Sequence, residues 1–144
     1  LSRTGYRLPT QSEWEYACAA GSNEAWHFGS NSKNTAGYEW TSPHSQEQVH
    51  DVARLRPNAF GFFDMGGNLA EWTDDFMRQP LRSKESFFAD DAGNFGDVNP
   101  AYRVLCGGRF RLSQATAMTT MFAYFAPEHR STSTGFRIAR TLAP

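Results

Sequence analysis

The pattern of apolar and polar positions predicts one clear helix near the start of the chain. Thr10 and Glu13 have the spacing of a capping box, in which each side chain accepts a hydrogen bond from a backbone N–H near the other. Three apolar positions behind them recur at helical spacing and form one core-facing stripe: Trp14, Ala17 and Cys18. We expect a helix over residues 11–20, with Gly21 just past its end.

The later part of the chain carries three short runs that are typical of strands. Residues 102–105, 118–124 and 135–139 are rich in aromatic or β-branched side chains and are bounded by Gly, Pro or polar turns. We expect them to pair as a small antiparallel sheet. Residues 21–57 and 76–100 show neither the helical nor the strand spacing of apolar residues. This predicts ordered loops in the first segment and a long exposed loop in the second. The chain therefore predicts an α+β domain with little regular secondary structure.

Composition limits the size and the class of the protein. With 144 residues, 40% of them hydrophobic and 15% aromatic, the chain suffices for one compact domain. Its formal net charge of -1 comes with no basic stripe, so we expect no nucleic-acid partner. No apolar run approaches the roughly 20 residues that cross a bilayer, so we expect no membrane segment.

The chain has two cysteines, Cys18 in the expected helix and Cys106 in an expected strand. Two cysteines cannot build a disulfide-rich scaffold. We interpret both as buried, reduced thiols, and the compartment of the protein stays open.

The segment of residues 58–72, NAFGFFDMGGNLAEW, places the carboxylates of Asp64 and Glu71 on either side of a Gly-Gly turn. Hard cations such as Ca²⁺ bind carboxylate and backbone carbonyl oxygens, and glycines let the backbone turn its carbonyls inward. This pattern predicts a small cation site. In one alternative the two carboxylates cap local backbone N–H groups without a metal, and in another a neighbouring Arg137 or Arg103 neutralises them.

Four motifs occur in a fixed order between residues 5 and 140: YRLPT-x-x-EWEYA, PNAFG-x-x-DM-x-GN-x-x-EW, RVL-x-GG and GFR-x-AR. In these motifs the chain resembles the formylglycine-generating enzyme family, also called the sulfatase-modifying-factor family. The resemblance implies a variant of the C-type lectin fold. Residues 1–144 would form a single domain of that family, either its C-terminal half, a fragment of a longer protein or a minimal variant.

The resemblance also implies roles for individual residues. Family members hold a structural Ca²⁺ through two side chains and two backbone carbonyls, which correspond here to Asp64, Gly67, Leu69 and Glu71. The oxidase members bind copper through two cysteines that follow the RVL-x-GG motif. Leu112 and Ala117 stand at those positions. Because neither side chain can ligate copper, we expect no copper and lean against enzymatic activity.

Residues 108–134 mix arginines with aromatic side chains, which supply much of the binding energy at protein interfaces. We predict a ligand-binding surface at Arg109, Arg111, Tyr124, Phe125, His129 and Arg130. The alternative is that Phe122 and Tyr124 are core-facing strand residues.

The sequence thus predicts a non-catalytic ligand-binding, protein-binding or sensor module that calcium stabilises. One alternative is a sulfatase-modifying oxidase whose missing cysteine is supplied from elsewhere. A second alternative is a variable binding protein of the kind that retroelements diversify. A second polypeptide that supplies the N-terminal half of the domain is a further candidate partner.

Overall fold

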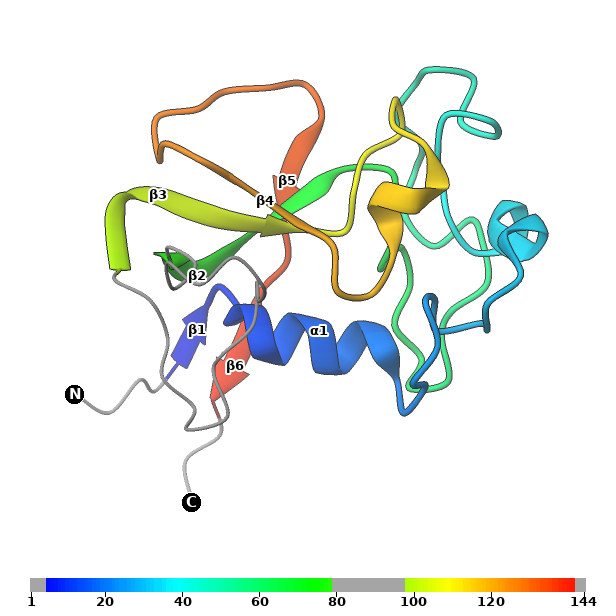
Figure 1. Cartoon of the computed structure of the whole chain (residues 1–144), viewed down its shortest axis with the longest axis horizontal. Coiled ribbons are helices and arrows are strands. Elements are labelled where there is room, and N and C mark those ends of the chain that lie inside the picture. The colour runs from blue at the N-terminus through cyan, green and yellow to red at the C-terminus, as the bar shows by residue number, and fades with distance from the viewer. Residues whose placement is uncertain (1–4, 79–97, 142–144) are drawn as a thin grey trace, which may run out of the picture.

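The computed structural model describes residues 5–78 and 98–141. The helical and strand elements follow in this order: β1 (Gly5–Arg7), α1 (Gln11–Ala19), the 3-10 helix η1 (Ser32–Gly37), β2 (Ala70–Arg78), β3 (Val98–Cys106), the 3-10 helix η2 (Gln114–Ala117), β4 (Phe122–Phe125), β5 (Thr134–Phe136) and β6 (Ala139–Thr141). Long irregular segments join these short elements (Figure 1). The mixed α+β class with little regular secondary structure is confirmed.

The strands form two sheets. The larger sheet has the order β4-β3-β2-β5, and the smaller pairs β1 with β6 near the two ends of the chain (Figure 1). Within the larger sheet β2 with β3 and β3 with β4 are antiparallel. The expectation of an entirely antiparallel sheet is wrong in one respect, because β5 runs parallel to β2. This parallel pair places the residue after β5 beside the start of β2.

Helix α1 has the expected capping box. The Thr10 side chain accepts from the Glu13 N–H at 3.1 Å, and the Glu13 carboxylate accepts from the Thr10 N–H at 2.8 Å. The helix ends at Ala19, one residue before the expected end, because Ala20 has a left-handed backbone with φ of 49°. Its apolar stripe is buried as predicted, with Trp14 and Cys18 in the core against Met65, Val104 and Cys106.

The predicted strands are only partly correct. Residues 102–105 lie inside the longer β3, whereas the run at 118–124 becomes a strand only from Phe122 onward. The run at 135–139 is divided between β5 and β6. Strand β2 was not expected, and both β2 and β3 reach into the segment 76–100 that we expected to be a loop. The middle of that loop, residues 79–97, lies outside the described residues.

No helix within residues 5–78 and 98–141 has the length and apolarity that a membrane span requires.

Candidate functional site

The Gly66-Gly67 turn is fixed by close contacts that only glycine permits. A Cβ on Gly67 would clash with the Trp40 carbonyl oxygen, and the turn has a positive φ of 73° at this residue. Asn68 fastens the turn to the preceding loop, because its amide group accepts from the His50 N–H at 3.1 Å and donates to the His50 carbonyl at 3.0 Å. The turn therefore presents the residues around it in one defined arrangement.

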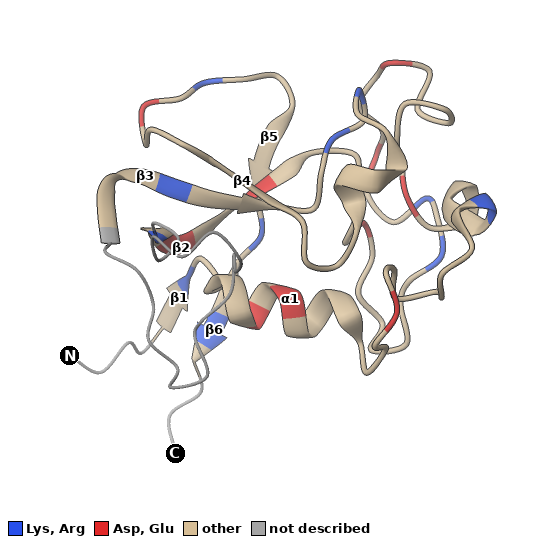
Figure 2. Ribbon diagram, viewed as in Figure 1, with Lys and Arg blue, Asp and Glu red and all other residues tan. Residues whose placement is uncertain are grey.

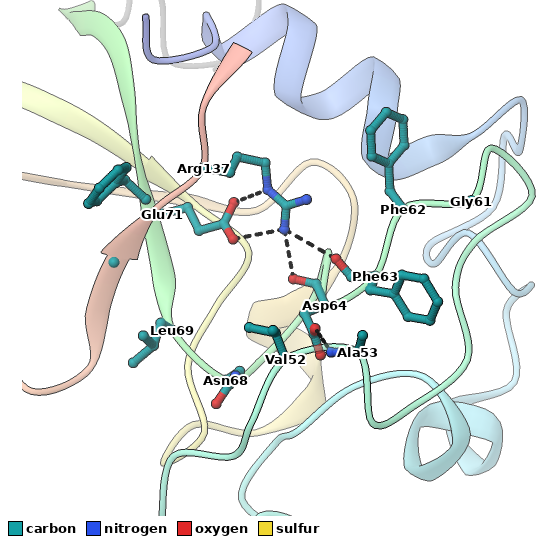
Figure 3. A pocket seen from close by; sticks show the side chains of 12 residues that line it. Val52, Ala53, Gly61, Phe62, Phe63, Asp64, Asn68, Leu69, Glu71 and Arg137 are labelled. Atoms are coloured by element: carbon teal, nitrogen blue, oxygen red, sulfur yellow. Dashed lines mark hydrogen bonds and ion pairs between the residues drawn. The ribbon is translucent and has the colours of Figure 1, made fainter. Parts of the chain in front are cut away.

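An ion pair between Glu71 and Arg137 lies beside this turn (Figure 3). The Arg137 Nε donates to Glu71 Oε2, and its Nη2 donates to Glu71 Oε1 at 2.8 Å. The indole N–H of Trp14 also donates to Glu71 Oε2, at 2.7 Å. Glu71 is the second residue of β2 and Arg137 follows β5, so the parallel pairing of these strands brings the two charges together. The carboxylate thereby accepts three hydrogen bonds from two side chains.

The same guanidinium group reaches across to the backbone at residues 63–64. Arg137 Nη2 donates to the Asp64 carbonyl at 3.0 Å and to the Phe63 carbonyl at 3.3 Å. The Asp64 carboxylate turns the other way, and its Oδ2 accepts from the Ala53 N–H at 2.7 Å. Asp64 thus caps a backbone N–H, as in the alternative in which the carboxylates bind backbone N–H groups without a metal.

Three of the four predicted calcium ligands line one pocket of about 460 Å³: Asp64, Leu69 and Glu71. Gly67 is not among the lining residues, and its N–H bonds to the Gly107 carbonyl at 2.6 Å. Because Arg137 and Trp14 use both Glu71 oxygens, this arrangement of donors does not fit a calcium ion. Within the described residues no group of three His, Cys, Asp or Glu side chains could hold a metal. Calcium binding stays a prediction, and it requires Arg137 to release Glu71.

Arg137 is one of the two arginines that, from the sequence, could neutralise the Asp64 and Glu71 carboxylates in place of a cation. The other, Arg103, lies elsewhere: its guanidinium group is 3.7 Å from Asp74 and 3.7 Å from the centroid of the Phe76 ring. The pocket rim is apolar and exposed, and its side chains come from the preceding loop and from β5: Val52, Phe62, Phe63 and Phe136. Sequence reasoning missed this rim, because exposed apolar residues in irregular segments follow no period.

Sequence reasoning also missed Glu39, a carboxyl group that is only 1% exposed. Within the described part of the chain neither of its oxygens has a hydrogen-bond partner, and its side chain packs against Gly66. Burial raises the pKa of Glu39 to about 8, because removal from water disfavours the charged form. No spacing or motif around this residue indicates its burial.

The positions of the family's catalytic cysteines carry no thiol. Leu112 is 39% exposed, and Ala117 is buried at the end of η2. The two cysteines of the chain, Cys18 and Cys106, are free and buried in the core, as the sequence predicted. Burial raises the pKa of both thiols, so neither is an activated nucleophile.

The predicted ligand-binding surface is partly assembled around β4. Phe125 stacks on His129 with ring centroids 4.2 Å apart, and the Arg109 guanidinium lies 5.2 Å from the Phe125 centroid. Arg130 is exposed beside this stack and donates to the Pro127 and His129 carbonyls. Arg111 lies apart from it, over the ring of buried Phe110.

Two aromatic residues of β4, Phe122 and Tyr124, are 43% and 46% exposed. They pair with Cys106 and Val104 and so lie on the core side of the sheet, but at its edge they are not buried in the core as the alternative expected. Tyr124 makes an edge-to-face contact with Tyr102 of β3, with centroids 6.1 Å apart.

Comparison with known proteins agrees with the motifs. Residues 1–142 match the model of the Sulfatase-modifying factor enzyme 1-like domain. The formylglycine-generating enzyme of Streptomyces coelicolor is 32% identical over 161 residues, which covers 94% of this chain and 46% of that protein. Chaperone protein LppX of Paenibacillus barcinonensis is 28% identical over 115 residues, covering 67% of this chain and 41% of that protein.

Solved structures show the same fold. Treponema denticola variable protein 1 superposes with a TM-score of 0.82 at 30% identity, covering 96% of this chain and 49% of that one. PvdO from Pseudomonas aeruginosa superposes with a TM-score of 0.77 at 26% identity, covering 95% of this chain and 53% of that one. The chain thus spans about half the length of the relatives it matches. It belongs to the family of Sulfatase-modifying factor enzyme 1-like domains.

Proposed function

We propose that this chain is a non-catalytic binding or sensor module on a formylglycine-generating-enzyme-like scaffold. The observation that carries the proposal is the chemistry at the two catalytic positions, Leu112 and Ala117. Copper-dependent oxidation needs accessible thiolates. The thiols of Cys18 and Cys106 are buried, and burial raises their pKa.

The surface around β4 supports a binding role. Its exposed aromatic and arginine side chains, together with half-buried Arg109, are of the types that contribute most to interfaces: Tyr102, Phe122, Tyr124 and Arg130. The similar structure of a protein named variable protein 1 favours binding by this scaffold, and it keeps the diversified binding protein as a candidate of the same class.

The second candidate function is a sulfatase-modifying oxidase. The 32% identity to the Streptomyces coelicolor formylglycine-generating enzyme favours it. Such an activity would require cysteines from outside the positions of Leu112 and Ala117, either from the buried pair or from another polypeptide.

Oxygen consumption separates the two functions. The purified chain is mixed with Cu(I) and a cysteine-containing peptide, beside the Streptomyces coelicolor enzyme as a positive control. We expect no oxygen uptake above that of copper and peptide alone. Uptake that disappears in Cys106→Ser or Cys18→Ser would show that the chain is an oxidase and would refute the proposal.

A further inference from the structure

Strand β4 is an edge strand of the larger sheet that residues 5–78 and 98–141 form. It lies at one end of the sheet order β4-β3-β2-β5, and among the described residues it pairs only with β3. An edge strand presents unpaired backbone groups that can accept another extended chain.

The hydrogen bonds of β3 identify which groups of β4 point outward. The Thr73 hydroxyl donates to the Val104 carbonyl at 3.1 Å, so the backbone of Val104 is directed toward β2. Neighbouring residues of a strand direct their backbone groups to opposite sides. Arg103 and Leu105 therefore bond to β4, through their partners Phe125 and Ala123.

It follows that Phe122 and Tyr124 direct their N–H and C=O groups away from β3. Among the backbone hydrogen bonds of the described turns and loops, none uses these four groups. Their side chains are also exposed and lie on the same face as Tyr102. The outer edge therefore combines backbone donors and acceptors with aromatic surface.

Basic residues outnumber acidic ones in the part of the chain that carries this edge. Residues 98–141 contain six arginines and one glutamate, but Arg103 and Arg137 are paired with Asp74 and Glu71 of β2. Figure 2 shows basic positions on β3 and in the loop that follows β4. Arg109 and Arg130 lie at the Phe125 end of the strand, and Glu128 is the one acid in this part of the chain.

We propose that β4 binds an acidic segment of another polypeptide, which adds to the sheet as an extended strand. The inference rests on the proposed binding function and specifies its partner and geometry. Phe122 and Tyr124 supply the backbone hydrogen bonds, while Arg109 and Arg130 attract the acidic side chains. Since two residues alone offer outward backbone groups, the arginines and the aromatic face contribute much of the affinity.

Selection from a library of random short peptides tests both parts of the inference. We expect the peptides that bind the chain to be rich in Asp and Glu together with β-branched residues, and to bind more weakly as salt rises. Arg130→Glu is expected to weaken the binding about tenfold or more, whereas Arg54→Glu, at a distant exposed arginine, leaves it unchanged. Selected peptides that are basic or neutral would overturn the inference.

A second pair of variants, at Tyr124, tests whether the peptide adds to β4 as a strand. Proline is tolerated at edge positions whose N–H faces solvent, so Tyr124→Pro removes one outward donor while the sheet remains intact. Its affinity is expected to fall about tenfold below that of Tyr124→Ala, which keeps the N–H. Melting temperatures of both variants check the fold, and Arg130→Glu provides the test if Tyr124→Pro is unstable.

The outcomes separate the inference from the proposed function. If Arg130→Glu weakens binding but Tyr124→Pro and Tyr124→Ala bind alike, strand addition is wrong and the binding function stands. If the acidic peptides are displaced by RNA equally in all variants, the surface is a general anion-binding face and the inference fails. A selection that yields no peptide contradicts the inference and the peptide-binding form of the function together.

Discussion

Arg137 lies between Glu71 and the backbone of residues 63–64, where the family resemblance implies a calcium ion. The ion pair is largely buried, with side-chain exposures of 25% for Arg137 and 12% for Glu71. We expect Arg137→Ala to lower the free energy of unfolding by roughly 3 kcal/mol, because Glu71 is left buried with Trp14 as its remaining partner. Calcium should restore part of this loss by binding the released carboxylate.

Thermal unfolding in calcium and in EGTA measures both effects. The rise in Tm caused by calcium is expected to be larger in Arg137→Ala than in the unchanged chain. Arg140→Ala, at an exposed arginine three residues later, should leave the Tm and its calcium response as they are. If calcium shifts neither protein, the carboxylates of Asp64 and Glu71 form no cation site and the calcium prediction is wrong.

Glu39 makes the stability of the fold depend on pH. Its pKa is raised to about 8 in the folded chain, against 4.5 as its ordinary value, because burial disfavours the charge. The folded state therefore holds this proton more tightly than the unfolded state. The resulting stability is complete below about pH 4.5 and is lost as the pH rises to about 8.

Glu39→Gln should remove this dependence of stability on pH, since an amide stays neutral between pH 4.5 and 8. We expect the Tm of the unchanged chain to fall on the order of 10 °C more than that of the variant between pH 5 and 8. Calorimetry over this range measures the difference. Glu13, whose pKa Arg7 lowers to about 2, acts only below about pH 4.5 and so does not affect the comparison. Parallel Tm curves for the two proteins would show that Glu39 is ionised in the fold.

At the scale of elements, an element defined by local sequence signals could be predicted, whereas the pairing of strands could not. Helix α1 could be placed within one residue because its capping box and apolar stripe lie within the helix itself. Strand β2 has no such signal: Asp74 and Asp75 interrupt its pattern, and it is a strand because β3 and β5 pair with it on both sides.

The candidate sites, too, could be predicted only as far as local sequence patterns define them. Asp64 and Glu71 could be found from their spacing around two glycines, and Arg137 could be named as a competitor. The pairing of Arg137 with Glu71 depends on the parallel arrangement of β2 and β5, which no local pattern specifies. The alternation in β4 showed that Phe122 and Tyr124 share a face. Only the sheet order shows that β4 is the edge strand, where this face, which is buried at Val104 and Cys106 of β3, becomes exposed.

At the scale of the whole molecule, one face carries much exposed apolar surface. Large apolar side chains line the pocket: Val52 at 77% exposure, Phe136 at 66%, Phe62 at 44% and Phe63 at 39%. Ile138, at 63% exposure, follows two residues after Phe136. Contiguous apolar surface of this kind marks places where proteins bind other chains. Because the relatives are about twice as long, a segment that completes a domain of family length is a proposed cover for this face.

Replacing two of these residues by threonine tests whether the face drives association. We expect Phe136→Thr with Ile138→Thr to leave the Tm nearly unchanged, since exposed substitutions change stability by about 0.5 kcal/mol or less and threonine suits a strand. The same variant should reduce self-association of the isolated chain, measured by light scattering over a concentration series. Phe110→Thr is the contrasting control, because Phe110 is 2% exposed and its replacement should cost roughly 3–5 kcal/mol. An unchanged chain that stays monomeric at every concentration, with no partner in its native mass, would show that this apolar face needs no cover.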